Sequence, residues 1–103
     1  MFEVLRTKMF DKRLRKLPAE FRGWVDKIEE QLMLNPYVGD QLQVPWLREK
    51  KLGKFRVYYL IYDDLNAVYM VNISGKKNQQ QVIDTVLLLL DIYKSEVRNL
   101  VRR

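Results

Sequence analysis

Apolar residues recur at helical spacing in two stretches near the start of the chain. Phe10, Leu14 and Leu17 lie on one face of a helix predicted over residues 9–17. Pro18 interrupts this pattern and suits the first turn of a new helix, where its missing N–H costs nothing. The apolar face of that second helix continues towards Asn35-Pro36 with Phe21, Trp24, Val25, Ile28 and Leu32. The two helices are expected to form a hairpin with a very short turn, with Trp24 in the core.

Strand patterns occupy the first residues and the middle of the chain. Residues 2–6 are predicted as a short strand, and residues 44–52 as a strand with a basic end. The strongest strand signal is KFRVYYLIY, residues 54–62, which is rich in aromatic and β-branched residues. A turn at residues 63–66 leads to the returning strand, AVYMVNIS, residues 67–74. Because these last two strands are apolar on both faces, they are expected to be central in the sheet.

The last quarter of the chain is predicted as one helix over residues 79–103. Leu88 and Leu89 widen its apolar arc beyond one face, which fits either a covered core helix or a surface that awaits a partner. Residues 36–43 are predicted as a loop. The element order indicates one α+β domain over residues 1–103, with a compact, mainly antiparallel sheet, an N-terminal helical hairpin and a C-terminal helix.

The composition removes several kinds of chemistry. The chain has no Cys and no His, which excludes disulfides, thiolate catalysis and the usual zinc ligands, so no metal or other cofactor is expected. A net charge of +6 favours a polyanionic or acidic partner over simple solubility. The N-terminus lacks the apolar region of a signal peptide, and the longest apolar run, residues 86–90, is too short to cross a membrane. The expected compartment is the cytoplasm, with no membrane partner.

The positive charge is clustered along the chain. Residues 48–56 contain a single acid, Glu49, among five cations: Arg48, Lys50, Lys51, Lys54 and Arg56. Lys76 and Lys77 follow the last strand. A hairpin that turns at residues 63–66 is predicted to place Arg56 close to Ile73 and Lys54 close to Gly75. The two basic groups would then meet at one end of the sheet, although a slip of one residue would reverse the faces.

Three stretches together resemble the RelE/ParE superfamily of toxins from type II toxin–antitoxin modules, and the RelE-type mRNA interferases most of all. The first is the predicted helical hairpin, with Lys16-Leu17-Pro18 at its centre and Leu34-Asn35-Pro36 at its end. The second leads from Leu47-Arg48-Glu49 into Gly53-Lys54-Phe55-Arg56-Val57-Tyr58-Tyr59. The third is Val71-Asn72-Ile73-Ser74-Gly75-Lys76-Lys77. Together, in this order and spacing, the three stretches cover nearly the whole chain.

The resemblance carries expectations about function. The RelE branch implies a metal-independent endoribonuclease that cuts mRNA on the ribosome, whereas the ParE branch implies a toxin that poisons DNA gyrase without hydrolysis. A nucleic-acid-binding relative that has lost toxicity is a third alternative. Both branches imply a tight, usually acidic antitoxin that wraps the toxin.

Site residues follow from the resemblance and from the charge pattern. Arg56 matches the arginine of the family's strand motif and is expected to contact the scissile phosphate, a role that suits the bidentate guanidinium. Its alternative is a strand residue paired to an acid. Lys77 matches a basic position after the last strand and is expected to share the catalytic role. Lys50, Lys51 or Lys54 is expected to be the general base, because neighbouring cations favour the neutral form of a lysine.

The remaining basic residues are expected to hold RNA. These RNA-binding candidates are Arg48, Lys50, Lys76, Lys12 and Arg13. Lys12 and Arg13 belong to a basic helix face that is either solvated or docked on ribosomal RNA. Ile83 stands where the RelE branch often has a tyrosine at the start of the last helix, which leaves cleavage in question, with Tyr58, Tyr62 or Tyr93 as substitutes.

Overall fold

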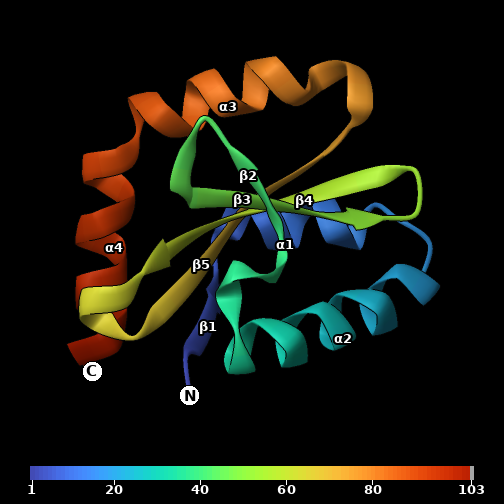
Figure 1. Ribbon diagram of the computed structural model, residues 1–103. Coiled ribbons are helices and arrows are strands. Elements are labelled where there is room, and N and C mark those ends of the chain that lie inside the picture. The colour runs from blue at the N-terminus through green and yellow to red at the C-terminus, as the bar shows by residue number, and fades with distance from the viewer. Residues whose placement is uncertain (103) are drawn as a thin grey trace.

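A five-stranded sheet is the central element of the computed structural model, which describes residues 1–102 (Figure 1). In chain order the strands are β1 (Glu3–Arg6), β2 (Asp40–Leu42), β3 (Val44–Leu52), β4 (Phe55–Tyr62) and β5 (Ala67–Gly75). Their order in the sheet is β1-β5-β4-β3-β2, and every pairing is antiparallel except that of β1 with β5. The expected α+β class and the mainly antiparallel sheet are therefore confirmed.

Helices cover both faces of this sheet (Figure 1). The four α-helices are α1 (Lys8–Arg15), α2 (Glu20–Leu34), α3 (Gln79–Leu88) and α4 (Leu90–Arg102). Single 3-10 turns link other elements: η1 (Pro36–Val38), η2 (Asp63–Leu65) and η3 (Lys76–Asn78). Among the described residues, no helix is long and apolar enough to cross a membrane.

Two separate cores result, because the central strands alternate apolar side chains towards both faces. On one face, α1 and α2 pack on residues of β4 and β5 that include Val57, Tyr59 and Met70. On the other face, α3 and α4 pack on Tyr58, Leu60 and other residues of the same strands. The prediction that residues 54–62 and 67–74 are central strands is confirmed.

The predicted register of this hairpin is correct near its turn and wrong at its far end. Tyr62 pairs with Ala67, as the predicted turn requires, but Arg56 pairs with Ser74 and not with Ile73. Gly75 pairs with Phe55 and not with Lys54. The cause is a β-bulge, since Tyr58 pairs with Asn72 while Tyr59 pairs with Met70, which leaves Val71 as an extra residue in β5.

The single closing helix predicted over residues 79–103 is wrong, because the chain bends at Leu89 and forms α3 and α4. The bend lets the apolar stripes of both helices reach the same sheet face, whereas a straight helix would carry its second half past the sheet. The widened arc of leucines marks this bend, and Leu88 on its outer side is 83% exposed. Arg103 lies outside the described residues.

Three smaller predictions about the first half of the chain also need revision. Helices α1 and α2 lie on the same sheet face, but α1 packs on β5 while α2 packs on β1 and β3, so a tight hairpin is not evident. The loop predicted at residues 36–43 contains η1 and β2. Trp24 is not a core residue: it is 41% exposed and packs edge-on against Phe21 beside the β3–β4 turn.

A buried tyrosine anchors the segment that precedes β2. The Tyr59 hydroxyl donates to the Pro36 carbonyl at 2.6 Å and accepts from the Gly39 N–H at 3.0 Å. Burial raises the pKa of Tyr59 to about 12, so the hydroxyl stays protonated and can donate. A Cβ at position 39 would collide with this hydroxyl and with the Glu49 carbonyl oxygen, so the close approach requires glycine.

Two glycine-to-alanine substitutions should therefore have opposite effects on stability. Gly39→Ala should lower the free energy of unfolding by about 1–3 kcal/mol, because the added methyl overpacks a fixed backbone contact. Gly23→Ala, in the interior of α2 with open space around its Cβ position, should raise it by about 0.5–1 kcal/mol. Urea denaturation followed by circular dichroism measures both, and equal stability of the two variants would contradict the described packing.

Candidate functional site

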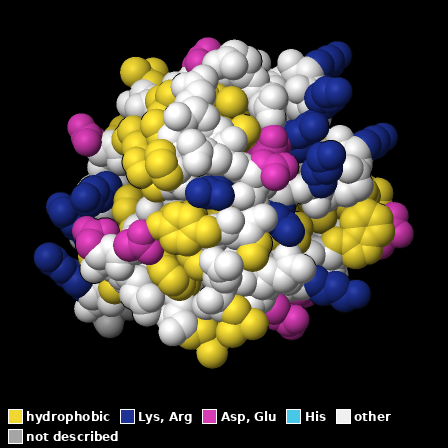
Figure 2. Space-filling model, viewed as in Figure 1, with side chains coloured by type: hydrophobic (Ala, Val, Ile, Leu, Met, Phe, Trp, Pro, Cys, Tyr) yellow, Lys and Arg dark blue, Asp and Glu magenta, His cyan; other side chains and the backbone are white. Residues whose placement is uncertain are grey.

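Lysine and arginine side chains gather where the β3–β4 turn lies next to the start of α3. Figure 2 shows these cations along the upper right edge of the molecule, over the elements that Figure 1 places there. We call this region the basic edge and define it by Lys51, Lys54, Arg56, Lys76 and Lys77. None of the four lysines forms an ion pair with any of residues 1–102, so their charge is available to a partner.

Strand pairing places Arg56 in the middle of a row that crosses three strands. Lys51 of β3 pairs with Arg56, and Arg56 pairs with Ser74 of β5. Directly paired residues share a sheet face, and here it is the face covered by α3 and α4, because Tyr58 of that core lies two residues further along β4. The adjacent row on the same face is formed by Glu49, Tyr58 and Asn72.

Arg56 forms an ion pair with Glu49, the one acid of the basic segment. Arg56 Nε and Glu49 Oε2 lie 2.8 Å apart in an ion contact without the alignment of a hydrogen bond, and the side chains are 16% and 8% exposed. Gln79 of α3 donates from Nε2 to the other carboxylate oxygen, Oε1, at 2.5 Å. The alternative that Arg56 pairs with an acid is thus realised. The terminal guanidinium nitrogens of Arg56 donate no hydrogen bond within residues 1–102, so they can still bind an anion.

Neighbouring groups and burial shift the pKa of the Glu49 carboxyl in opposite directions. Burial raises the pKa of the Glu49 carboxyl and outweighs the Arg56 guanidinium, which lowers it, and the Asp40 carboxylate adds a further increase. The net shift is upwards, towards neutral pH. Glu49 is therefore a titratable group next to a guanidinium in a chain without histidine.

Tyr58 is the tyrosine that lies beside this ion pair. Its hydroxyl is 2.8 Å from Ser74 Oγ, and burial raises its pKa, so it stays a neutral phenol. Ile83 is buried in the core beneath α3, so its side chain points into the sheet and away from the basic edge. Tyr62 packs against that same core, and Tyr93 lies on α4.

Other predicted RNA-binding residues lie elsewhere. Lys50 pairs with Val57 and so lies on the face covered by α1 and α2, opposite to Arg56. Arg48 is on that face too, where it donates to the carbonyls of Pro45, Tyr37 and Gly39 and stacks over the Tyr37 ring. It supports the loop before β2.

The two predicted residues of α1 also differ from each other. Lys12 is exposed on α1. Arg13 reaches β5, where its Nη1 donates to the Ile73 carbonyl at 3.1 Å. Their roles towards RNA remain predictions.

The prediction of site residues omitted those that organise Arg56. The charge pattern identifies Glu49 only as the acid opposing five cations, although a lone acid in a basic strand is itself a signal of an ion pair. The positions of Gln79 and Ser74 depend on how α3 and β5 meet β3 and β4, which the sequence does not reveal.

Comparisons with known proteins identify the fold. No protein-family model matches the sequence, and no curated protein matches it. The isolated E. coli RelE toxin is similar in structure, with a TM-score of 0.65 and 15% identity over 84% of this chain and 99% of that one. The archaeal RelE–RelB complex from Pyrococcus horikoshii gives a TM-score of 0.66 and 18% identity, over 73% of this chain and 94% of that one. The toxin–antitoxin complex RelBE2 from Mycobacterium tuberculosis gives 0.63 and 23%, over 73% and 98%. The resemblance found in the sequence is thus confirmed at the level of the fold.

The raised pKa of Glu49 makes a prediction about stability and pH. A carboxyl whose pKa is higher in the folded state than in the unfolded state binds more protons when folded, so its contribution to stability falls as pH rises. The free energy of unfolding of the unmodified protein, relative to Glu49→Gln, should therefore be largest at acidic pH. It should decrease as pH rises from the ordinary glutamate range towards neutrality. Urea denaturation across that range measures the difference.

The same substitution at Glu30, an exposed residue of α2, provides the baseline for removing a surface carboxylate. A difference between the unmodified protein and Glu49→Gln that grows with pH would contradict the prediction.

Proposed function

We propose that this protein is the toxin of a type II toxin–antitoxin pair and that it cleaves mRNA on the ribosome as a metal-independent endoribonuclease. The observation that carries the proposal is the arrangement of Arg56. Its guanidinium is held by the buried Glu49 through Nε, its terminal nitrogens are unengaged within the described residues, and Lys51 and Ser74 flank it in the same row.

RNA supplies its own nucleophile, the 2′-hydroxyl, whose attack on the adjacent phosphorus gives a 2′,3′-cyclic phosphate and a free 5′-hydroxyl. The protein has to stabilise the extra negative charge on the phosphorus oxygens and to transfer two protons. We assign the charge stabilisation to Arg56, because a fork of donors fixed from behind by an acid is preorganised for two phosphate oxygens. Lys77 of η3 shares this role from the end of β5.

The proton transfers need one acceptor and one donor close to that phosphate. We assign the acceptor to Glu49, which adjoins Arg56 and whose pKa is raised by burial, so that its carboxylate is a stronger base than that of an ordinary glutamate. We assign the donor to the ammonium group of Lys51, the neighbour of Arg56 in β3. Of the three lysines predicted as the general base, Lys50 lies on the other sheet face and Lys54 lies in the turn, which leaves Lys51 beside Arg56, here as the donor and not as the base.

The remaining cations are proposed to hold the RNA backbone. Lys54 and Lys76 continue the basic edge on either side of Arg56, and Lys12 and Arg13 add positive charge on α1. Contacts of this kind neutralise phosphates and release counterions, so the affinity for RNA should fall as salt concentration rises.

The proposed protein partner is an acidic antitoxin. Several of the similar structures are complexes of RelE with RelB, and the net charge of +6 on this chain suits an acidic partner. The proposed compartment is the cytoplasm, where ribosomes and mRNA occur.

The double variant Arg56→Ala with Lys77→Ala should abolish cleavage, with product below about one hundredth of the unmodified level, because an oxyanion-stabilising group typically contributes 10²–10³ in rate. Cleavage is measured by primer extension on a message in a cell-free translation system. Assay of the ends for 2′,3′-cyclic phosphate tests the reaction itself. A folded double variant, as judged by circular dichroism, that cleaves at the unmodified rate would refute the site.

Two further variants separate charge from geometry. Lys27→Ala with Arg98→Ala removes the same charge from exposed helical positions away from the basic edge and should keep most of the cleavage. Arg56→Lys keeps the charge but loses the guanidinium fork, so it should be nearly as inactive as Arg56→Ala.

Intact message together with inhibited DNA supercoiling would instead support a gyrase-directed toxin.

A further inference from the structure

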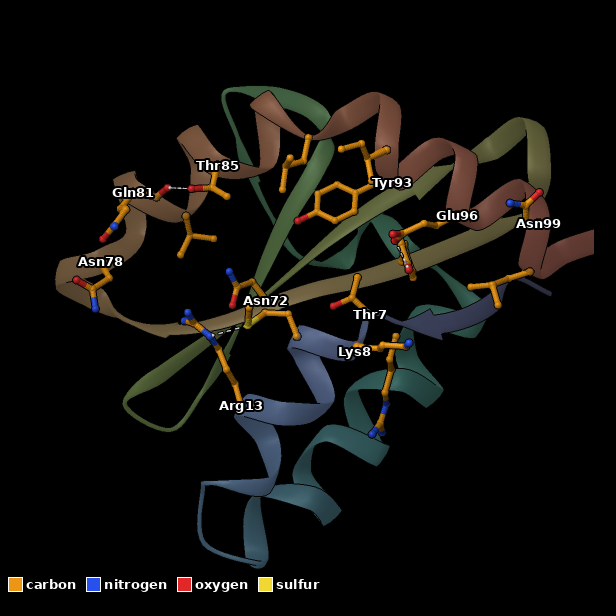
Figure 3. A pocket seen from close by; sticks show the side chains of 17 residues that line it. Thr7, Lys8, Arg13, Asn72, Asn78, Gln81, Thr85, Tyr93, Glu96 and Asn99 are labelled. Atoms are coloured by element: carbon orange, nitrogen blue, oxygen red, sulfur yellow. Dashed lines mark hydrogen bonds between the residues drawn. The ribbon is translucent and has the colours of Figure 1, made fainter.

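A cavity of about 820 Å³ opens between α1, α3 and α4, with β5 as its floor (Figure 3). Figure 3 shows Arg13 and Asn72 at one end, opposite Asn78 of η3 and Gln81 of α3, and Tyr93 reaching in from α4. Glu96 and Asn99 lie towards the other end. A cavity of this volume, with mainly apolar walls and a few convergent polar groups, is typical of a small-molecule site.

The floor of the cavity is an edge of β5 that no strand covers. β1 pairs with β5 only as far as Met70, and side chains satisfy the backbone beyond that point. Thr7 Oγ1 donates to the Val71 carbonyl at 3.0 Å, and Arg13 donates to the Ile73 carbonyl. Asn72 Oδ1 accepts from the Ile73 N–H at 2.9 Å, which fixes the orientation of the Asn72 amide.

That orientation leaves the Asn72 amide nitrogen without a partner among the described residues. Asn72 is only 9% exposed, and it lines the cavity. A donor that is fixed in orientation and open to the cavity can be satisfied by a ligand that accepts a hydrogen bond. The Tyr93 hydroxyl is a second such group, with no partner in residues 1–102, and burial raises its pKa, so it remains a donor.

The same end of the cavity adjoins the basic edge. Asn72 pairs with Tyr58, in the row next to Arg56, and Asn78 directly follows Lys77 in η3. A nucleotide attached to a phosphate at Arg56 would therefore be next to Asn72 and Arg13. Amide side chains and an aromatic ring are the groups with which proteins recognise unstacked RNA bases.

We propose that this cavity binds one ribonucleotide, the neighbour of the scissile phosphate, through Asn72, Tyr93 and the amides of α3. The proposal rests on the proposed function, because it takes RNA as the substrate. An acidic peptide is disfavoured as the occupant, since a chain running the length of the cavity would meet the carboxylate of Glu96, which is held there by the Tyr69 hydroxyl at 2.7 Å.

Binding can be measured without cleavage. The probes are the four ribonucleoside 3′-monophosphates and short RNA oligonucleotides whose 2′-oxygens are methylated, so that no 2′-hydroxyl can attack. Calorimetry and NMR titration of the full chain give the dissociation constants. The monophosphates report a site for a free nucleotide, and the oligonucleotides report a site for a strand.

Asn72→Asp should weaken binding by at least about tenfold, because it keeps the acceptor for Ile73 N–H but replaces the free donor with a negative oxygen. Tyr93→Phe, which removes only a hydroxyl, should weaken binding by about threefold to tenfold. Asn99→Asp adds the same charge at the far end of the same cavity and should change binding by less than about twofold. If Asn72→Asp does not fold, Tyr93→Phe still tests whether the cavity binds the nucleotide.

The outcomes separate this site from the proposed reaction. Loss with Asn72→Asp and Tyr93→Phe but not with Asn99→Asp supports the site, even in a protein that cleaves no message. No binding by the unmodified protein, or equal losses for Asn72→Asp and Asn99→Asp, overturns it. Binding of a polyglutamate peptide that depends on Asn72, without nucleotide binding, overturns it in favour of a protein ligand.

Discussion

The pairing of β4 with β5 is the constraint on which the rest of the molecule depends. Both strands are apolar on both faces, so each face has to be covered by helices, and the chain supplies one pair of helices between β1 and β2 and one pair after β5. Only the far end of the strand pair carries polar groups towards the second core. Arg56, Ser74 and their neighbours lie there, at the place where α3 begins. The candidate site therefore lies at the end of this core, where charged and polar side chains follow the buried apolar ones.

Much of the fold followed from the sequence because it depends on local patterns. The helical spacing of Phe10 and Leu14, and the aromatic run after Lys54, predicted elements that the structure contains. The register could be predicted only up to Val71, because a bulge is stabilised by tertiary contacts, here the Thr7 hydroxyl on the Val71 carbonyl, and has no local signature. Trp24 shows a similar limit: helical spacing identifies an apolar stripe, but it does not tell how far along the helix the sheet extends.

The sequence predicts where the candidate site lies, but it does not predict how the side chains of the site are arranged. Clustering of cations in the sequence predicts that they share one edge of the sheet, and Lys51 and Arg56 are neighbours there. It could not separate Lys50 from Lys51, which differ by one position and lie on opposite faces, because the face depends on register. Nor could it assign Glu49, whose importance comes from being buried against Arg56, a consequence of the way α3 covers the strand end.

The bulge also links the site to the cavity beside it. The extra residue in β5 keeps Asn72 and Ser74 on the face of Arg56, while Ile73 points to the opposite core. It also brings the Asn72 amide onto the Ile73 N–H, so one side chain both closes the open strand edge and presents a donor to the cavity. Without the bulge, the predicted register would pair Arg56 with Ile73, and Asn72 and Ser74 would face α1 and α2 instead. A single inserted residue therefore determines which side chains of β5 lie beside Arg56, and that choice brings the ion pair and the cavity together.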